Sequence, residues 1–66
     1  MYYNKLKEIR LEKGMTLKEI AEKANISAGY LCHLEKGTRA NPSIDVMEKL
    51  AKALDKTIFE IFFSKE

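Results

Sequence analysis

The sequence predicts an all-α protein, a single domain over residues 1–66 with five short helices and a helix-turn-helix at residues 16–36. Apolar residues make up 45% of the chain and charged residues 33%, with one proline, which is typical of a small helical domain and argues against disorder or a β-sandwich. Apolar residues at positions 17, 20, 21 and 24 recur on one helical face. The turn-forming sequence Asn25-Ile26-Ser27 then separates this helix from the next one.

The first helix is expected to begin at Asn4, a candidate N-cap, and to end at Gly14, which readily adopts the left-handed conformation of a helix end. Leu6 and Ile9 fall on its core-facing side. Arg10 follows Ile9 on that side, so a cation points toward apolar neighbours and requires an anionic partner.

The second helix begins with a capping box formed by Thr16 and Glu19. The same device recurs at Thr57 and Glu60, before the last helix. Both pairs satisfy backbone N–H groups that a helix start leaves without partners.

The third helix is expected over residues 28–36, with Ser27 as its N-cap and Gly37 at its end. Leu31 and Leu34 face the core, so the opposite face of this helix is left to contact a partner.

A polar loop over residues 38–42 leads to Ser43, which caps a fourth helix over residues 44–54. This helix is scaffold. Its inward positions are expected to be Ile44, Met47, Leu50, Ala51 and Leu54.

The last helix, over residues 58–63, has more apolar surface than one core-facing stripe requires. Phe59 and Phe63, four positions apart, share a second face and indicate a dimer interface. The alternative is that they fold back over Tyr2 and Tyr3. The core-facing positions of this helix are expected to be Ile58, Ile61 and Phe62.

Several features occur together: Ala21 where the two helices cross, the closing segment Glu35-Lys36-Gly37, and the segments Asn41-Pro42-Ser43-Ile44 and Leu50-Ala51-Lys52-Ala53-Leu54. In these features the chain resembles the Cro and C1-type (XRE-like) helix-turn-helix proteins of phages and bacteria. The segment Tyr30-Leu31-Cys32-His33-Leu34-Glu35 is most similar to the small repressors of the biofilm and sporulation switch in Gram-positive bacteria. The resemblance implies a compact five-helix lambda-repressor-like fold and a sequence-specific DNA-binding transcriptional regulator.

The resemblance also implies which residues contact DNA, since the third helix of this fold enters the major groove. His33 can donate to a purine, Ala28 can touch a thymine methyl group, and Gly29 permits close backbone approach. No Arg, Lys, Asn or Gln stands at these positions, and the alternative for His33 is an exposed surface histidine. The candidate DNA contacts are Thr16, Leu17, Lys18, Ser27, Ala28, Gly29, Tyr30, Cys32, His33, Lys36, Thr38, Arg39 and Asn41.

Alternatives remain for several of these residues. Thr16 either contacts a phosphate or serves only as a cap, and Leu17 replaces the glutamine of many relatives, which removes one polar contact. The loop with Arg39 lies along the DNA backbone, enters the minor groove, or is simply solvated. Cys32 faces the groove, fills the core in part, or is a redox-sensitive thiol. For Arg10 and Glu35 the resemblance implies a structural ion pair rather than a DNA contact.

The composition itself excludes other classes. Twelve basic and ten acidic residues give a net charge of +2, which by itself does not indicate nucleic acid. One histidine, no nucleophile paired with a base and no metal-ligand cluster argue against an enzyme or a metal site. One cysteine cannot form an internal disulfide, and no apolar run approaches the roughly 20 residues that span a bilayer. We expect a cytoplasmic protein without a cofactor, small-molecule ligand, membrane attachment or separate effector domain.

The expected partners are double-stranded DNA, a second copy of the chain, and a protein antagonist or partner regulator. A homodimer presents two reading helices to an inverted-repeat operator. Repression is expected, because a bound dimer blocks polymerase, and the alternative is activation of polymerase by contact with the same surface. The alternative function is a protein-interaction module, an antitoxin or adaptor, which the weak base-reading chemistry of Ala28 and Gly29 leaves open.

Overall fold

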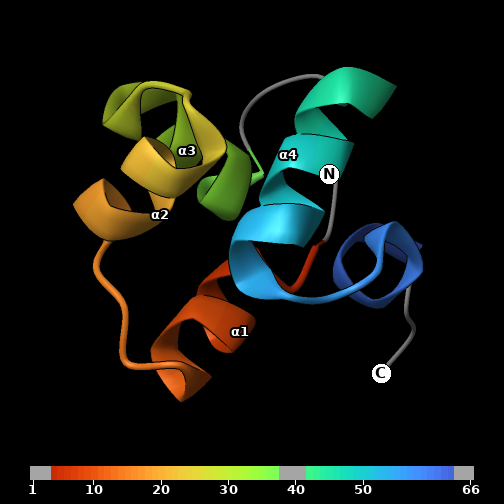
Figure 1. The fold of residues 1–66 in the computed structure, drawn as a ribbon, viewed down its shortest axis with the longest axis horizontal. Coiled ribbons are helices and arrows are strands. Elements are labelled where there is room, and N and C mark those ends of the chain that lie inside the picture. Colours follow the sequence, from red (N-terminus) through yellow and green to blue (C-terminus); the bar gives the residue numbers. More distant parts are fainter. Residues whose placement is uncertain (1–3, 38–41, 64–66) are drawn as a thin grey trace.

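Helices account for most of the chain in the computed structural model, which describes residues 4–37 and 42–63. They are α1 (Leu6–Glu12), α2 (Leu17–Ala24), α3 (Ala28–Lys36), α4 (Ile44–Leu54) and a short π-helix η1 (Phe59–Phe63). In Figure 1, α2 and α3 lie together at one side of the molecule, α4 runs beside them, and α1 lies below. α1 contacts both α3 and η1, so the two ends of the described chain come together. The predicted all-α class with a helix-turn-helix at α2 and α3 is confirmed.

Side-chain caps set most of the helix starts at the predicted residues. The Thr16 hydroxyl accepts a hydrogen bond from the Glu19 N–H at 3.1 Å, and the Glu19 carboxylate accepts one from the Thr16 N–H at 2.8 Å. Ser27 and Ser43 cap α3 and α4 through their hydroxyl oxygens. The start of α1 differs, because regular helix begins at Leu6, two residues later than expected.

Residues in the left-handed backbone conformation end helices α1 to α4. Gly14 and Gly37 have φ values of 67° and 70° and follow α1 and α3, as predicted. Asn25 ends α2 in the same conformation, with φ of 59°. Asp55, at 56°, does the same for α4, where the sequence offered no glycine or asparagine.

The core lies where all five helices meet, and its fully buried side chains come from each of them. One inward prediction was wrong: Ile44 is 62% exposed. Helical side chains lean toward the N-terminus, so a residue at the first position of α4 extends past the end of the helix instead of onto the core. Ile58 packs against the core but is only half-buried. The fully buried side chains are Leu6, Ile20, Leu31, Leu34, Leu50, Leu54 and Ile61.

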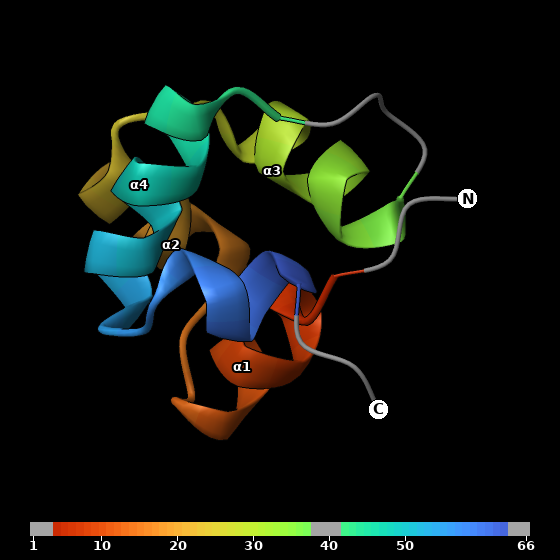
Figure 2. The ribbon, with the colours of Figure 1, turned by 90° about the vertical axis from the view of Figure 1, so that its right-hand side faces the viewer.

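η1 closes the fold against α1. The predicted capping box is present, because Thr57 and Glu60 exchange backbone-to-side-chain hydrogen bonds of 2.8 and 3.0 Å. The Lys5 N–H donates to the Ile61 carbonyl at 2.9 Å. Figure 2 shows η1, in blue, beside α1 and the first described residues. Within the described ranges, no helix is both long and apolar enough to cross a bilayer.

Candidate nucleic-acid interface

One face of α3 packs into the core, and the residues predicted to contact DNA bases lie on its exposed face. Leu31 and Leu34 are buried in the core, whereas Ala28, Gly29 and His33 are exposed. A helix turns by about 100° per residue, so these three exposed positions lie on one outward arc of α3. The helix therefore presents a continuous surface that begins at its N-terminus.

Two predicted contact residues on α3 are less accessible. Cys32 is half-buried. Tyr30 falls near the opposite side of the helix from Ala28 and packs in part against the core. Tyr30 thus lies at the flank of the outward arc. Ser27, which is exposed, lies at the start of this arc.

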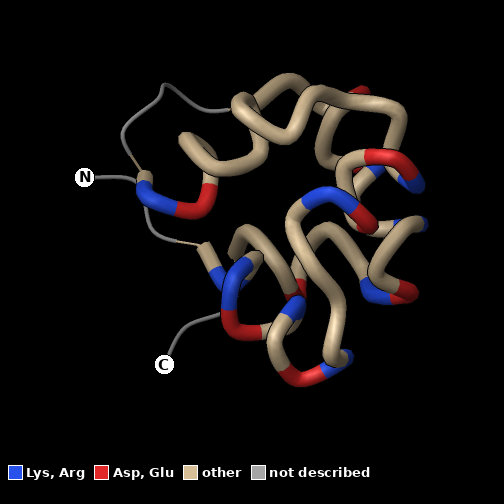
Figure 3. The backbone as a smooth tube through the Cα atoms, turned by 90° about the vertical axis from the view of Figure 1, so that its left-hand side faces the viewer, with Lys and Arg blue, Asp and Glu red and all other residues tan. Residues whose placement is uncertain are grey.

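The outward arc of α3 has no formal negative charge. Residues from Ala28 to Leu34 include no acid, and Glu35 and Lys36 follow them at the end of the helix. Figure 3 colours the acidic and basic residues of the described chain red and blue, and uncharged stretches such as this one tan. Lys36 is exposed, whereas the Glu35 side chain is only 7% exposed and faces Arg10. A polyanion approaching α3 meets a neutral surface with a cation at its end.

The ion pair between Arg10 and Glu35 is present in the structure. Arg10 Nε lies 2.7 Å from Glu35 Oε2, and Arg10 Nη2 lies 3.2 Å from Glu35 Oε1, so the contact is bidentate. Arg10 Nη1 also donates to the Met15 carbonyl at 3.0 Å. The hydrogen bonds that Arg10 donates to the Glu35 carboxylate raise the pKa of the Arg10 guanidinium above its ordinary value. One guanidinium thereby joins α1, the last turn of α3 and the segment before α2.

α2 packs against α3, and its start supplies the other described candidates. Thr16 and Lys18 are exposed, so both are accessible to a phosphate. Leu17 is half-buried against the core, which makes it a packing residue as well as a candidate contact. The candidates Thr38, Arg39 and Asn41 lie outside the described residues, as do Tyr2 and Tyr3, the alternative partners of the last helix.

Sequence reasoning missed one residue of this region. Asn4 Nδ2 donates a hydrogen bond to the Leu34 carbonyl in α3 at 2.8 Å. The sequence indicated only a cap for α1, because nothing in a local pattern shows a contact between residues 30 positions apart.

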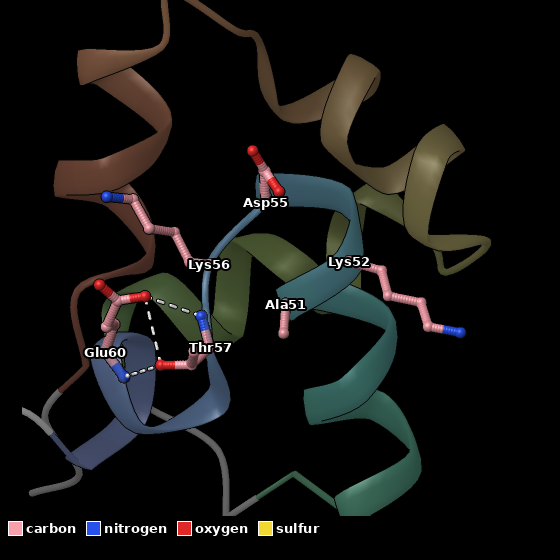
Figure 4. A pocket seen from close by; sticks show the side chains of 6 residues that line it. All are labelled: Ala51, Lys52, Asp55, Lys56, Thr57 and Glu60. Atoms are coloured by element: carbon pink, nitrogen blue, oxygen red, sulfur yellow. Dashed lines mark hydrogen bonds between the residues drawn. The ribbon is translucent and has the colours of Figure 1, made fainter.

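A shallow hollow elsewhere on the surface does not have the residues of a binding site. Figure 4 shows an open hollow between the end of α4 and η1, where Thr57 and Glu60 bond to each other and the Lys52 side chain extends outward. Its charges are mixed and do not converge on one point. In the parts of the chain that the structure describes, no group of three or more His, Cys, Asp or Glu residues is placed to hold a metal ion. The hollow is lined by Ala51, Lys52, Asp55, Lys56, Thr57 and Glu60.

α3 packs against α2 by its buried face, and its exposed face is neutral and ends at a basic residue. This arrangement defines a helix-turn-helix domain of the nucleic-acid-binding type. The Helix-turn-helix family model matches residues 6–61, and the chain belongs to this family. The predicted Cro and C1-type membership is thereby confirmed.

Relatives and solved structures agree with this assignment. The chain is 36% identical over 66 residues to the HTH-type transcriptional regulator SinR of Bacillus licheniformis, covering the whole chain and 60% of that protein. The N-terminal DNA-binding domain of SinR from Bacillus subtilis superposes with a TM-score of 0.84 at 35% identity, over 94% of this chain and 88% of that one. A structure of SinR, described as the master regulator for biofilm formation, in complex with DNA gives 0.78 at 41% identity, over 82% and 86%.

The chain spans about 60% of the length of the SinR relative. The relatives are transcriptional regulators, which are not enzymes, in agreement with the expectation from the sequence.

Proposed function

We propose that this protein is a sequence-specific DNA-binding transcriptional regulator in which α3 enters the major groove. The observation that carries the proposal is the outward arc of α3, which is exposed, free of acidic residues and fixed from behind by Leu31 and Leu34. The complex of the related SinR with DNA supports the same role for the fold.

Base reading is assigned to the exposed first turns of α3. His33 supplies a hydrogen-bond donor, and Ala28 an apolar contact for a thymine methyl group. A Cβ atom built on Gly29 meets nothing within 4 Å, so packing inside the protein does not demand glycine there. The missing side chain instead leaves room for the helix backbone to approach the base edges, beside Ser27, Tyr30 and Cys32.

Phosphate contacts surround this reading surface. Thr16 and Lys18 are exposed at the start of α2, which packs against α3, and Lys36 is exposed at the end of α3. Phosphate contacts fix the register of a protein on DNA without reading sequence. Thr38, Arg39 and Asn41, which follow Lys36 in the sequence, are assigned to the same phosphate contacts. Leu17 belongs to the contact region beside Thr16, but its apolar side chain offers a phosphate no hydrogen bond.

A homodimer through η1 provides the second reading helix. Phe59 is 66% exposed and Phe63 is 54% exposed, although both are large apolar side chains on the last helix. A two-fold dimer buries such a patch against its own copy. Two copies of α3 about 34 Å apart then fit an inverted repeat, and the bound dimer excludes polymerase from promoter DNA. A protein antagonist that covers η1 or α3 would relieve this repression.

The test is selection of bound sites from a random duplex pool with the purified protein at moderate salt. Recovery of a short inverted repeat is the expected result. Recovery of a single half-site would support specific reading but contradict the dimer. A folded protein that recovers nothing above background would contradict DNA reading and favour a protein-interaction module.

A further inference from the structure

Asn4 connects two helices through both ends of its side-chain amide. Nδ2 donates to the Leu34 carbonyl of α3 at 2.8 Å, and Oδ1 accepts from the Leu6 N–H of α1 at 2.9 Å. The reverse orientation of the amide would place donor against donor and acceptor against acceptor, so the two contacts together fix it. The amide is therefore a specific bridge between the start of α1 and the end of α3.

The Leu34 carbonyl is well suited to this donor. It belongs to the last turn of α3, where carbonyl groups have no partner one turn further along the helix. It also accepts the Gly37 N–H, at 3.2 Å. The C-terminal end of a helix has partial negative charge, so a neutral amide donor is favoured there and a carboxylate is repelled.

The residue after Asn4 extends the connection to η1. The Lys5 N–H donates to the Ile61 carbonyl at 2.9 Å, and Ile61 belongs to the same short helix as Phe59 and Phe63. Figure 2 shows the first described residues, in red, running between the end of α3 and η1. Residues 4 and 5 thus contact the reading helix and the helix that we assign to the dimer interface.

We propose that Asn4 is a positioning residue for DNA reading, which holds the orientation of α3 relative to η1. The proposal rests on the proposed function, in which α3 reads bases and η1 joins two protomers. In such a dimer the angle between α3 and η1 determines the separation of the two reading helices. Asn4 therefore determines how strictly the protein requires one half-site spacing.

Two substitutions separate this role from helix capping. Asn4→Ser and Asn4→Asp both retain an oxygen that can accept the Leu6 N–H, so the start of α1 keeps its cap. Neither retains the amide that donates to the Leu34 carbonyl. Serine is uncharged and serves as the control for the carboxylate of aspartate, which also repels phosphate.

The experiment measures dissociation constants on three duplexes of equal length: the selected inverted repeat, the same repeat with half-site spacing changed by one base pair, and random DNA. For the wild type we expect at least about tenfold weaker binding at the changed spacing. For Asn4→Ser we expect unchanged random-DNA binding and a thermal midpoint near that of the wild type. We expect operator binding to weaken about three- to tenfold, and the spacing preference to fall below about threefold. Asn4→Asp should show the same loss of spacing preference, with weaker binding to all three duplexes.

Wild-type operator affinity and spacing preference in Asn4→Ser would overturn the positioning role. Equal losses on operator and random DNA would also overturn it, since general destabilisation gives that result. A wild-type protein that does not prefer the selected repeat over random DNA would refute the proposed function, and this role with it. A wild type that prefers the repeat but tolerates any spacing would refute the positioning role alone.

Discussion

In the proposed function, His33 is the residue on which sequence reading by α3 most depends. It is exposed on the outward arc, and the neighbouring Ala28 and Gly29 offer no side-chain hydrogen bond to a base. Because base contacts specify and phosphate contacts position, His33→Ala should weaken operator binding about tenfold and random-DNA binding much less. Titration of both duplexes by fluorescence anisotropy measures the two changes. Equal losses on operator and random DNA would remove His33 from the base-reading set.

Two other single residues, Arg10 and Glu35, contribute to the stability of the fold through their ion pair. Their side chains are 12% and 7% exposed, so Arg10→Met leaves a largely buried carboxylate without its bidentate partner. We expect this to cost about 3–5 kcal/mol, close to the whole stability of a small domain. Adding Glu35→Leu should restore most of the loss, since a buried pair is often replaceable by apolar residues. Urea unfolding of the single and double variants measures the difference, and a single variant as stable as the wild type would contradict the structural role.

At the scale of elements, the sequence was most informative where local chemistry decides the structure. Capping residues such as Ser27 and Ser43 set the starts of α3 and α4 at the predicted positions. Ile44 was misplaced because periodicity extends a stripe to the end of a helix without showing where the neighbouring helix stops. The π-helical hydrogen bonding of η1 was not predicted either, since apolar spacing does not distinguish a single π turn from an α turn.

The capping box of η1 has a pH dependence of a definite sign. The Thr57 N–H and hydroxyl bond to the Glu60 carboxylate and lower its pKa below 4.5, its ordinary value. The folded state therefore binds fewer protons than the unfolded state, so this contribution is complete above the ordinary pKa and is lost as the pH falls through the lowered one. Glu60→Gln keeps an acceptor oxygen but does not titrate, and its stability should fall less steeply below about pH 4.5. Thermal unfolding across this pH range measures how steeply stability falls with pH. Glu48→Gln in α4 is the control for loss of an exposed carboxylate. Parallel curves for the wild type and Glu60→Gln would contradict the expectation.

For the whole molecule, the site is predictable only as far as single helices determine it. The outward face of α3 followed from the burial of Leu31 and Leu34, which periodicity alone indicates. The partner of Arg10 required knowledge of a family, because 25 residues separate Arg10 from Glu35. The bond from Asn4 to Leu34 depends on how α1 and α3 pack, and no local signal indicates it.

The proposed dimer and the proposed phosphate contacts together predict how binding responds to salt. The logarithm of the binding constant falls with the logarithm of salt concentration with a slope of about −0.9 for each phosphate neutralised. A protomer with about 4–6 phosphate contacts then gives a slope near −4 to −5, and a dimer about twice that. The double variant Phe59→Ser with Phe63→Ser removes exposed apolar area from η1 without touching the buried Ile61 and Phe62. It should therefore be a folded monomer with about half the wild-type slope on the same operator.

Sedimentation velocity and titrations at several salt concentrations test the two consequences separately. A variant of monomer mass with half the slope is the expected combination, because each monomer then releases only its own counterions. An unchanged dimer mass would place the interface away from Phe59 and Phe63. A monomer with the full wild-type slope would mean that the wild type also binds as one protomer, and that the operator is read by a single α3.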